Sequence, residues 1–239
     1  MISFLNQLKT AKKEGIRLLA ILLDPDKILL ESVAELGAKI EALAADFIFV
    51  GGSLVKKGVT EQLVIELKKQ TNLKIILFPG DYSQIAPQAD ALLFLSLISG
   101  NNPEYLINQQ VKAVSKIQES KLEIIPTAYI LIDGGKVSSV EKISKTKPIS
   151  QHQNKLIVNT ALAGQFMGNQ LVYLEAGSGA KNPVKVSIIK KVASQLQIPI
   201  IVGGGIHSAK QLNQAYKNGA NLVVIGTAFE ENALLLKSQ

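Results

Sequence analysis

Short apolar runs rich in β-branched side chains recur along the whole chain, at intervals of roughly 20 to 45 residues. Most are apolar almost throughout rather than alternating between apolar and polar, which is typical of strands buried on both faces. The runs cover residues 17–23, 46–50, 74–78, 90–95, 124–131, 171–174, 199–202 and 222–225. The pattern therefore predicts eight short strands.

Most segments between these runs place their apolar residues on one face of a helix. In residues 28–43 the apolar positions are Leu29, Val33, Leu36 and Ile40, and the same period occurs in 60–69, 103–118, 184–196 and 208–218. Asn182 and Ser208 are the predicted N-caps of the last two helices. Residues 134–168 are long enough for two helices, with 144–153 between them as an exposed polar loop.

Strands that alternate with helices predict a parallel sheet with helical crossovers. Eight such units favour closure into an α/β fold of the (β/α)8 TIM-barrel type, with an open doubly wound sheet as the alternative. The 239 residues are close to the length of one such barrel. No linker or low-complexity segment divides the chain, so we expect a single domain over residues 1–239.

The composition excludes several classes of site. Without cysteine, the chain has no disulfide, no cysteine-based zinc site and no thiol nucleophile. Residues 1–13 are amphipathic and of mixed charge, unlike a signal peptide, and no run of about 18 apolar residues could span a membrane. We therefore expect a cytoplasmic protein.

The net charge of +7 indicates anionic ligands. Lysine pairs are scattered along the chain rather than gathered in one arm, aromatic residues make up only 5% and tryptophan is absent. We therefore expect no nucleic-acid partner, whereas phosphorylated metabolites and lipid headgroups suit this surface.

Glycine and small polar residues follow the last three predicted strands, at 176–179, 203–205 and 226–227. In a barrel the active site lies at these C-terminal strand ends. Glycine lets backbone N–H groups approach phosphate oxygens, although one such loop alone is as easily explained by a tight turn. Three consecutive glycine-rich loops favour a phosphate site.

Two carboxylates end strands near this predicted site. Glu175 suits a substrate hydroxyl, as acceptor or general base, with a salt-bridged structural role as the alternative. Tyr173, two residues earlier, points to the same face of the barrel. Asp24 precedes Pro25 and is either a helix N-cap or, with Ser53 on the neighbouring strand, a magnesium ligand.

Other candidate chemistry is weak in this sequence. No predicted strand interior contains a lone lysine for a Schiff base, and no histidine cluster has metal-binding spacing. His152 and His207 fall in predicted loops, where we expect surface positions, with a contact to the substrate as the alternative for His207 beside the triple glycine.

In its motifs the chain resembles the geranylgeranylglyceryl phosphate synthase family, a group of glycerol-1-phosphate prenyltransferases. The matching segments occur in family order at 22–27, 51–53, 102–107, 126–130, 173–179, 202–206 and 226–228. The segment Tyr-Leu-Glu-Ala-Gly-Ser-Gly at 173–179 is highly specific. Leu23, where other relatives have lysine, places the chain nearer the archaeal-like branch, and Thr227 stands where many relatives have asparagine.

The resemblance implies transfer of a long-chain prenyl group, geranylgeranyl foremost, from a prenyl diphosphate to the 3-hydroxyl of sn-glycerol 1-phosphate. The product is a precursor of ether lipids. Implied catalytic residues are Glu175 and Asp24, with Mg²⁺ held by Asp24 and Ser53. The glycerol-phosphate pocket of the family matches Tyr173, Leu174, Glu175, Ala176, Gly177, Ser178, Gly179, Gly204, Gly205, Gly226 and Thr227.

Further expectations concern the tail of the donor and the partners of the protein. An apolar groove for the prenyl tail is expected near residues 92–98. The family implies a homo-oligomer, and a lipid product is compatible with weak association with a membrane surface. Two other functions stay open: another phosphate-binding barrel enzyme such as a sugar-phosphate isomerase, and a non-enzymatic basic barrel that binds anions.

Overall fold

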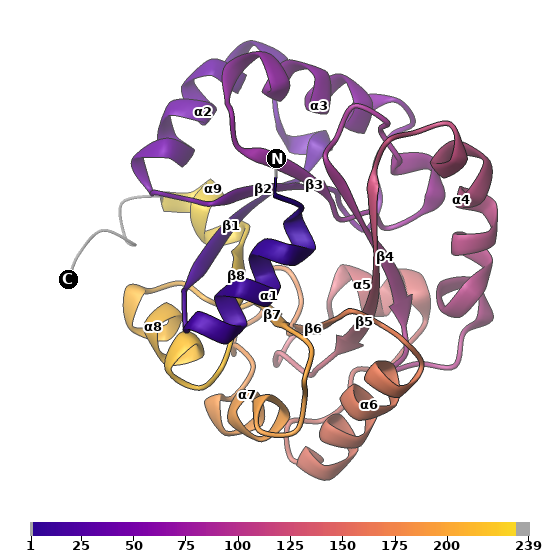
Figure 1. Cartoon of the computed structure of the whole chain (residues 1–239), viewed down its shortest axis with the longest axis vertical. Helices are drawn as coiled ribbons and strands as arrows, with labels where there is room; N and C mark the ends of the chain where they lie inside the picture. The colour runs from indigo at the N-terminus through magenta and orange to yellow at the C-terminus, as the bar shows by residue number, and fades with distance from the viewer. Residues whose placement is uncertain (1, 233–239) are drawn as a thin grey trace.

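The computed structural model describes residues 2–232 and is a closed barrel of eight parallel strands in sequence order, which confirms the predicted TIM barrel (Figure 1). The strands are β1 (Leu18–Leu23), β2 (Phe47–Val50), β3 (Lys74–Leu77), β4 (Ala91–Leu97), β5 (Glu123–Leu131), β6 (Leu171–Glu175), β7 (Ile200–Gly203) and β8 (Leu222–Ile225). The barrel closes where β1 pairs with β8, with Leu18 opposite Leu222. Residues 1 and 233–239 of the expected domain lie outside the described residues.

Helices surround the barrel, with α2, α3, α4, α6, α7 and α8 in a ring outside it (Figure 1). The helices are α1 (Phe4–Glu14), α2 (Val33–Ala42), α3 (Val59–Gln70), α4 (Gln109–Gln118), α5 (Ser139–Ser144), α6 (Asn154–Phe166), α7 (Val186–Ala193), α8 (Ala209–Lys217) and α9 (Thr227–Asn232). The crossover from β3 to β4 has only a 3-10 turn, Tyr82–Gln84, where a helix would be expected. None of the helices within residues 2–232 is long and apolar enough to cross a membrane.

Both faces of the strands are buried, which explains their continuous apolar sequences. Outward-facing side chains such as Ile48 and Val172 pack in a cluster with the helices. Inward-facing side chains such as Phe49 and Ile76 fill the barrel interior. The barrel is therefore a packed core, and ligands can enter only at its ends.

Helix α1 closes the N-terminal end of the barrel, across which it lies in Figure 1. The ring of Phe4 meets that of Phe47 edge-on at 4.8 Å, and Leu8 is completely buried. The carboxylate of Glu123, at the start of β5, accepts hydrogen bonds from the backbone N–H groups of Phe4 (2.7 Å) and Leu5 (3.1 Å). These amides are among those that a helix start leaves without a partner.

We expect Glu123→Ala to lower the free energy of unfolding by about 1–3 kcal/mol, because two part-buried amides of α1 lose their acceptor. Urea unfolding measures this change. The matched control is Glu119→Ala, an exposed position on the same segment, for which we expect a change within about 0.5 kcal/mol. Equal stabilities of the two variants would show that Glu123 does not fasten α1.

The element boundaries differ from the sequence pattern in two helices. The segment 28–43 forms a 3-10 turn at Leu30–Ser32 and becomes α-helical only at Val33. The segment 103–118 begins with a π-helical turn, Glu104–Asn108, before α4. The predicted apolar face holds from Val33 onward, where Val33 and Ile40 are buried, but not at Leu29, which is 68% exposed.

Of the two predicted N-caps, only Ser208 is confirmed: its hydroxyl accepts a hydrogen bond from the Gln211 N–H. Asn182 is not a cap, because α7 begins at Val186 and the Asn182 N–H donates to the Gly134 carbonyl at 3.0 Å. The asparagine instead joins two loops at the C-terminal end of the barrel.

The two helices predicted within 134–168 are present as α5 and α6, but the loop between them is not exposed as expected. Thr146, Ile149 and Gln151 are buried, and Ile149 pairs with Ile132. The side-chain amide of Gln151 donates to the carbonyls of Asp133 (2.8 Å) and Pro183 (3.1 Å). Backbone partners thus satisfy a polar side chain whose sequence context indicated solvent.

Candidate active site

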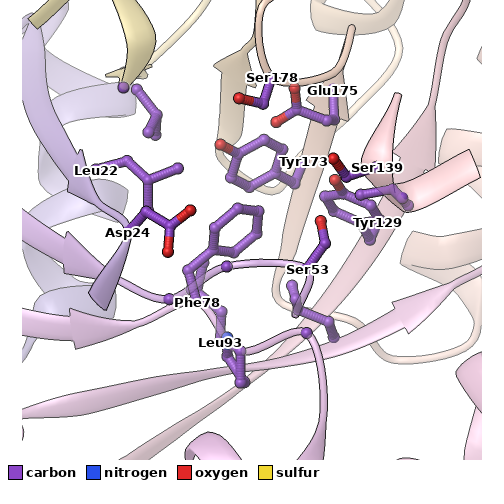
Figure 2. Close-up of a pocket in the computed structure, with 18 of the residues that line it drawn as sticks. Leu22, Asp24, Ser53, Phe78, Leu93, Tyr129, Ser139, Tyr173, Glu175 and Ser178 are labelled. Atoms are coloured by element: carbon purple, nitrogen blue, oxygen red, sulfur yellow. The ribbon is translucent and has the colours of Figure 1, made fainter. Parts of the chain in front are cut away.

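One cavity of about 500 Å³ opens at the C-terminal end of the barrel and is lined from the loops after all eight strands (Figure 2). Its lining includes these residues that were predicted from the sequence: Asp24, Ser53, Tyr173, Glu175, Ser178, Gly179, Gly204, Gly205, Gly226 and Thr227. The chain therefore brings together side chains that are up to about two hundred residues apart in sequence.

Three predicted residues of the 173–179 segment do not line the cavity. The side chains of Leu174 and Ala176 pack in the apolar layer between barrel and helices, because successive residues of a strand point to opposite faces. Gly177 lies behind Glu175 and donates its N–H to the Glu175 carboxylate. Its contribution is to orient that side chain.

The polar end of the cavity consists of closely packed backbone from the loops after β6, β7 and β8. A Cβ atom on Gly204, which has φ +82°, would lie 2.4 Å from Glu175 Oε1 and 2.7 Å from the Gly177 nitrogen, so only glycine fits there. The hydroxyls of Ser178 and Thr227 lie 3.3 Å apart and join the β6 and β8 loops. This concave, donor-rich surface suits a phosphate group.

Glu175 is the buried carboxylate of this end, with a relative exposure of 6%. Burial raises its pKa from 4.5 to about 7, although the hydrogen bond that Oε1 accepts from the Gly177 N–H at 2.6 Å favours the ionised form. The other oxygen, Oε2, and the Tyr173 hydroxyl both lie against Gly203, where a Cβ would be 2.8 Å and 2.4 Å away. A carboxyl with a pKa near neutrality is suited to accept a proton.

Aromatic rings form the cavity floor between the two carboxylates, Asp24 and Glu175. Phe78 stacks on Tyr173 with ring centroids 4.9 Å apart and an interplanar angle of 5°, and Tyr129 lies 5.4 Å from Tyr173. In the view of Figure 2, Asp24 and Ser53 lie on either side of Phe78, and Glu175 lies beyond Tyr173. The rings therefore give the cavity floor a rigid apolar surface.

Asp24 is the N-cap of the turn that follows β1, and its proposed role as a magnesium ligand stays a prediction. Its Oδ1 accepts a hydrogen bond from the Asp26 N–H at 3.2 Å, as an N-cap does, while the carboxylate still lines the cavity. Partial burial raises its pKa, and Lys27 Nζ lies 3.8 Å from Oδ2. No cluster of three or more His, Asp or Glu side chains within residues 2–232 could bind a metal unaided.

Magnesium nevertheless fits this edge of the cavity on the chemistry of its donors. Mg²⁺ is usually bound by one or two carboxylates, with waters and substrate phosphate oxygens completing its octahedron. Asp24 offers a carboxylate and Ser53 a hydroxyl, both hard oxygen donors on the same cavity.

The remaining part of the cavity is apolar and follows β4, where a groove was expected. Leu93 contributes from the barrel interior, and Leu92 and Ile85 from the layer outside it. The cavity thus extends beside the short β3–β4 crossover, which provides space that a full helix would fill. Tyr105, from the π-helical turn, and Ala113, from α4, line the same part.

Of the two positions considered for His207, the structure favours the one at the cavity, and His152 lies at the surface as predicted. His207 lines the cavity, half-buried, with its ring nitrogen Nε2 3.3 Å from the Ala180 carbonyl, whereas His152 is exposed. His207 stands two residues after the triple glycine Gly203–Gly205, and the tight turn of that loop places it at the cavity. Ser139 and Lys142 of α5 also line the cavity, and no pattern in the sequence indicated either residue.

Known proteins match this chain over nearly its whole length. The geranylgeranylglyceryl phosphate synthase of Zunongwangia profunda is 54% identical over 230 residues, which is 96% of this chain and 98% of that protein. The synthase of the same name from Thermococcus kodakarensis is 39% identical over 229 residues, covering 95% and 90%.

A solved structure extends the match to three dimensions. The (S)-3-O-geranylgeranylglyceryl phosphate synthase of Thermoplasma acidophilum, solved in complex with its substrate sn-glycerol-1-phosphate, is 33% identical and superposes with a TM-score of 0.92, covering 99% of this chain and 95% of that one. The model of the PcrB family matches residues 11–238. This chain belongs to the PcrB family.

Proposed function

We propose that this protein is a prenyltransferase that joins a long-chain prenyl group, geranylgeranyl foremost, to the 3-hydroxyl of sn-glycerol 1-phosphate, with Mg²⁺ as cofactor. The observation that supports this most directly is one continuous cavity with a donor-rich polar end, a buried carboxylate and an apolar groove. The identity of 39–54% to synthases of that name favours this reaction over sugar-phosphate isomerisation and over a non-enzymatic anion-binding role.

The polar end is the proposed site of the acceptor. Backbone N–H groups of the glycine-rich loops, with the hydroxyls of Ser178 and Thr227, bind the phosphate. Glu175 Oε2 accepts a hydrogen bond from the glycerol 3-hydroxyl and takes its proton as that oxygen attacks, because Oε1 is already occupied by the Gly177 N–H. Fixing hydroxyl and base together supplies the orientation that the reaction needs.

The donor lies with its diphosphate near Asp24 and its tail in the apolar groove along β4. As the glycerol oxygen bonds to the allylic C1 carbon, the C1–O bond to the diphosphate breaks and the diphosphate leaves with the electron pair. Bound Mg²⁺ would neutralise the charge that develops on this leaving group. Asp24 and Ser53 would hold the ion, and the aromatic floor excludes water from the reacting carbon.

Product formation tests the proposal directly. The purified protein is incubated with labelled sn-glycerol 1-phosphate, Mg²⁺ and prenyl diphosphates of increasing length in parallel. We expect label in an organic-extractable product, with the preferred donor reporting the depth of the groove. Folded protein that yields no product with any donor would contradict the proposed reaction.

We expect kcat/KM to rise with pH through an apparent pKa of about 7, because Glu175 must be ionised to accept the hydroxyl proton. The folded pKa lies above the ordinary value of 4.5, so the contribution of this group to stability declines as the pH rises from 4.5 through about 7. Measuring kcat/KM against pH, with glycerol-phosphate binding determined separately by calorimetry, checks the expected rise in kcat/KM. A kcat/KM that is flat from about pH 6 to 8 would exclude Glu175 as the base.

A lipid product gives reason to propose weak association with an anionic membrane surface. Leu29, Leu30 and Leu54 are exposed on the loops after β1 and β2, and Leu54 lines the cavity. Lys56 and Lys57, two and three residues after Leu54, are exposed as well. Vesicles with anionic lipid should sediment the protein at low salt and release it at high salt, and unchanged binding at high salt would exclude electrostatic attraction.

We also propose that the protein is a homo-oligomer in the cytoplasm. Ile107, Val111 and Val114 form an exposed apolar stripe at helical spacing on the segment of the π-helical turn and α4. Light scattering should give a mass above that of one chain, and Val111→Lys should lower it. A monomer at all concentrations would contradict this part of the proposal.

A further inference from the structure

Gln84 is a buried polar side chain without a role in the reaction as derived so far. It lies in the 3-10 turn between β3 and β4 with a relative exposure of 2%. Its Nε2 donates to the Gly52 carbonyl at 2.8 Å, and its Oε1 accepts from the Gly52 N–H at 3.2 Å. Both polar atoms of one side-chain amide are therefore bonded to the backbone of one residue in another loop.

The residue that Gln84 binds lies at the proposed metal edge of the cavity. Gly52 immediately precedes Ser53, and a Cβ atom on Gly52 would lie 3.1 Å from Asp24 Oδ1. On the other side, a Cβ on Gly80 would lie 2.4 Å from the Gly52 carbonyl oxygen and 2.7 Å from that of Ser53. The loop after β3 thus packs on the backbone of Gly52 and Ser53 with no space for a side chain at Gly80, and the Asp24 side chain packs closely against Gly52.

The turn that presents Gln84 is itself fastened. Asp81 Oδ1 accepts a hydrogen bond from the Ser83 N–H at 2.7 Å, and Gln109 Oε1 of α4 accepts one from the Tyr82 N–H at 2.9 Å. These two hydrogen bonds restrain the turn, so the backbone that carries Gln84 is held in place. Consecutive glycines, in contrast, give the 51–53 segment large conformational freedom unless other groups restrict it.

We propose that Gln84 is a positioning residue that holds Gly52 and Ser53 against Asp24 and so fixes the edge of the cavity that receives the metal-bound diphosphate of the donor. This inference rests on the proposed function. Gln84 has no hydrogen bond to the glycine-rich loops after β6, β7 and β8 among the described residues, so its loss acts on the donor diphosphate and leaves the acceptor phosphate site intact.

Direct binding without turnover separates these two effects. The probes are inorganic pyrophosphate with Mg²⁺ and, separately, sn-glycerol 1-phosphate, each titrated by calorimetry. In Gln84→Leu we expect the pyrophosphate Kd to rise about tenfold or more, and the glycerol-phosphate Kd to stay within about twofold. In steady-state kinetics the KM for the prenyl diphosphate rises in the same variant, while the KM for glycerol phosphate does not.

Two further variants control for a general structural effect. Gln84→Glu still accepts from the Gly52 N–H but, when ionised, cannot donate to the Gly52 carbonyl, so its pyrophosphate Kd should fall between those of the wild type and Gln84→Leu. It also serves as the test protein should Gln84→Leu fail to fold. The control is Gln88→Leu. Gln88 lies at an exposed position of the same crossover, and its side-chain amide donates to the Glu61 carboxylate. This variant should leave both dissociation constants unchanged.

Hydrogen–deuterium exchange gives a readout that does not depend on the reaction. Exchange of the amides in residues 51–55 should accelerate in Gln84→Leu, and that in α7 and α8 should not. Unchanged exchange at 51–55, or an equal loss of affinity for both probes, would overturn the positioning role. A wild-type protein that makes no prenyl product would instead refute the proposed function, and the exchange experiment would still decide whether Gln84 restrains the segment.

Discussion

Replacing Glu175 by glutamine is expected to lower kcat by about 10²- to 10⁴-fold, the usual contribution of a general base. Glutamine has almost the same shape, and its amide oxygen can still accept the Gly177 N–H bond at the position of Oε1. It cannot accept a proton from the glycerol hydroxyl. The variant should stay folded. Burial already disfavours the charged form of Glu175, and glutamine is neutral, so the substitution leaves no unpaired charge in the interior.

Binding and chemistry can be separated in the same variant. We expect the Kd for sn-glycerol 1-phosphate to change by less than about tenfold, since the amide still binds a hydroxyl. Product formation in a single turnover then reports the chemical step alone. The control is Glu66→Gln, a surface position on α3 paired with Lys69, which should react at the wild-type rate. A Glu175→Gln variant that retains most of its kcat would limit Glu175 to hydroxyl binding.

The order of elements could be predicted because burial on both strand faces leaves a continuous apolar signal. β8 has the predicted bounds, 222–225, whereas β4 extends two residues beyond the predicted 95. The polar Ser96 interrupts the apolar run there, yet it pairs with Ala128 in the sheet and its hydroxyl donates to the Leu106 carbonyl. The polar side chain of Ser96 thus indicated the end of the strand, although a hydrogen bond to a distant carbonyl lets it remain within β4.

Much of the candidate site could be predicted because a parallel barrel gathers its C-terminal strand ends in one place. Asp24, Ser53 and Glu175 all line the cavity for this reason. Single polar side chains that bind distant backbone gave no such signal. Gln84 and Gln151 resemble ordinary loop residues in sequence, and only the fold shows that each joins two loops.

Asp24 has a structural contact as well as its proposed metal role. Asn at this position still accepts the Asp26 N–H bond but lacks the negative charge, whereas Ala loses both. We expect the free energy of unfolding of Asp24→Asn to lie within about 0.5 kcal/mol of the wild-type value, and that of Asp24→Ala to be lower by about 1 kcal/mol. Both should lose about a hundredfold or more in kcat/KM at a fixed Mg²⁺ concentration, because each removes the only carboxylate of the donor set proposed for the ion.

Metal dependence decides between the two roles of Asp24. If the carboxylate binds Mg²⁺, the Kd of Mg²⁺-pyrophosphate measured by calorimetry should rise in both variants, and chelator should abolish wild-type activity. If the residue only caps the Pro25–Lys27 turn, Asp24→Asn should keep wild-type affinity and turnover, because the cap is still present. Full activity of the wild type in excess chelator would exclude the metal altogether and leave neutralisation of the leaving diphosphate to lysines that line the cavity, such as Lys27.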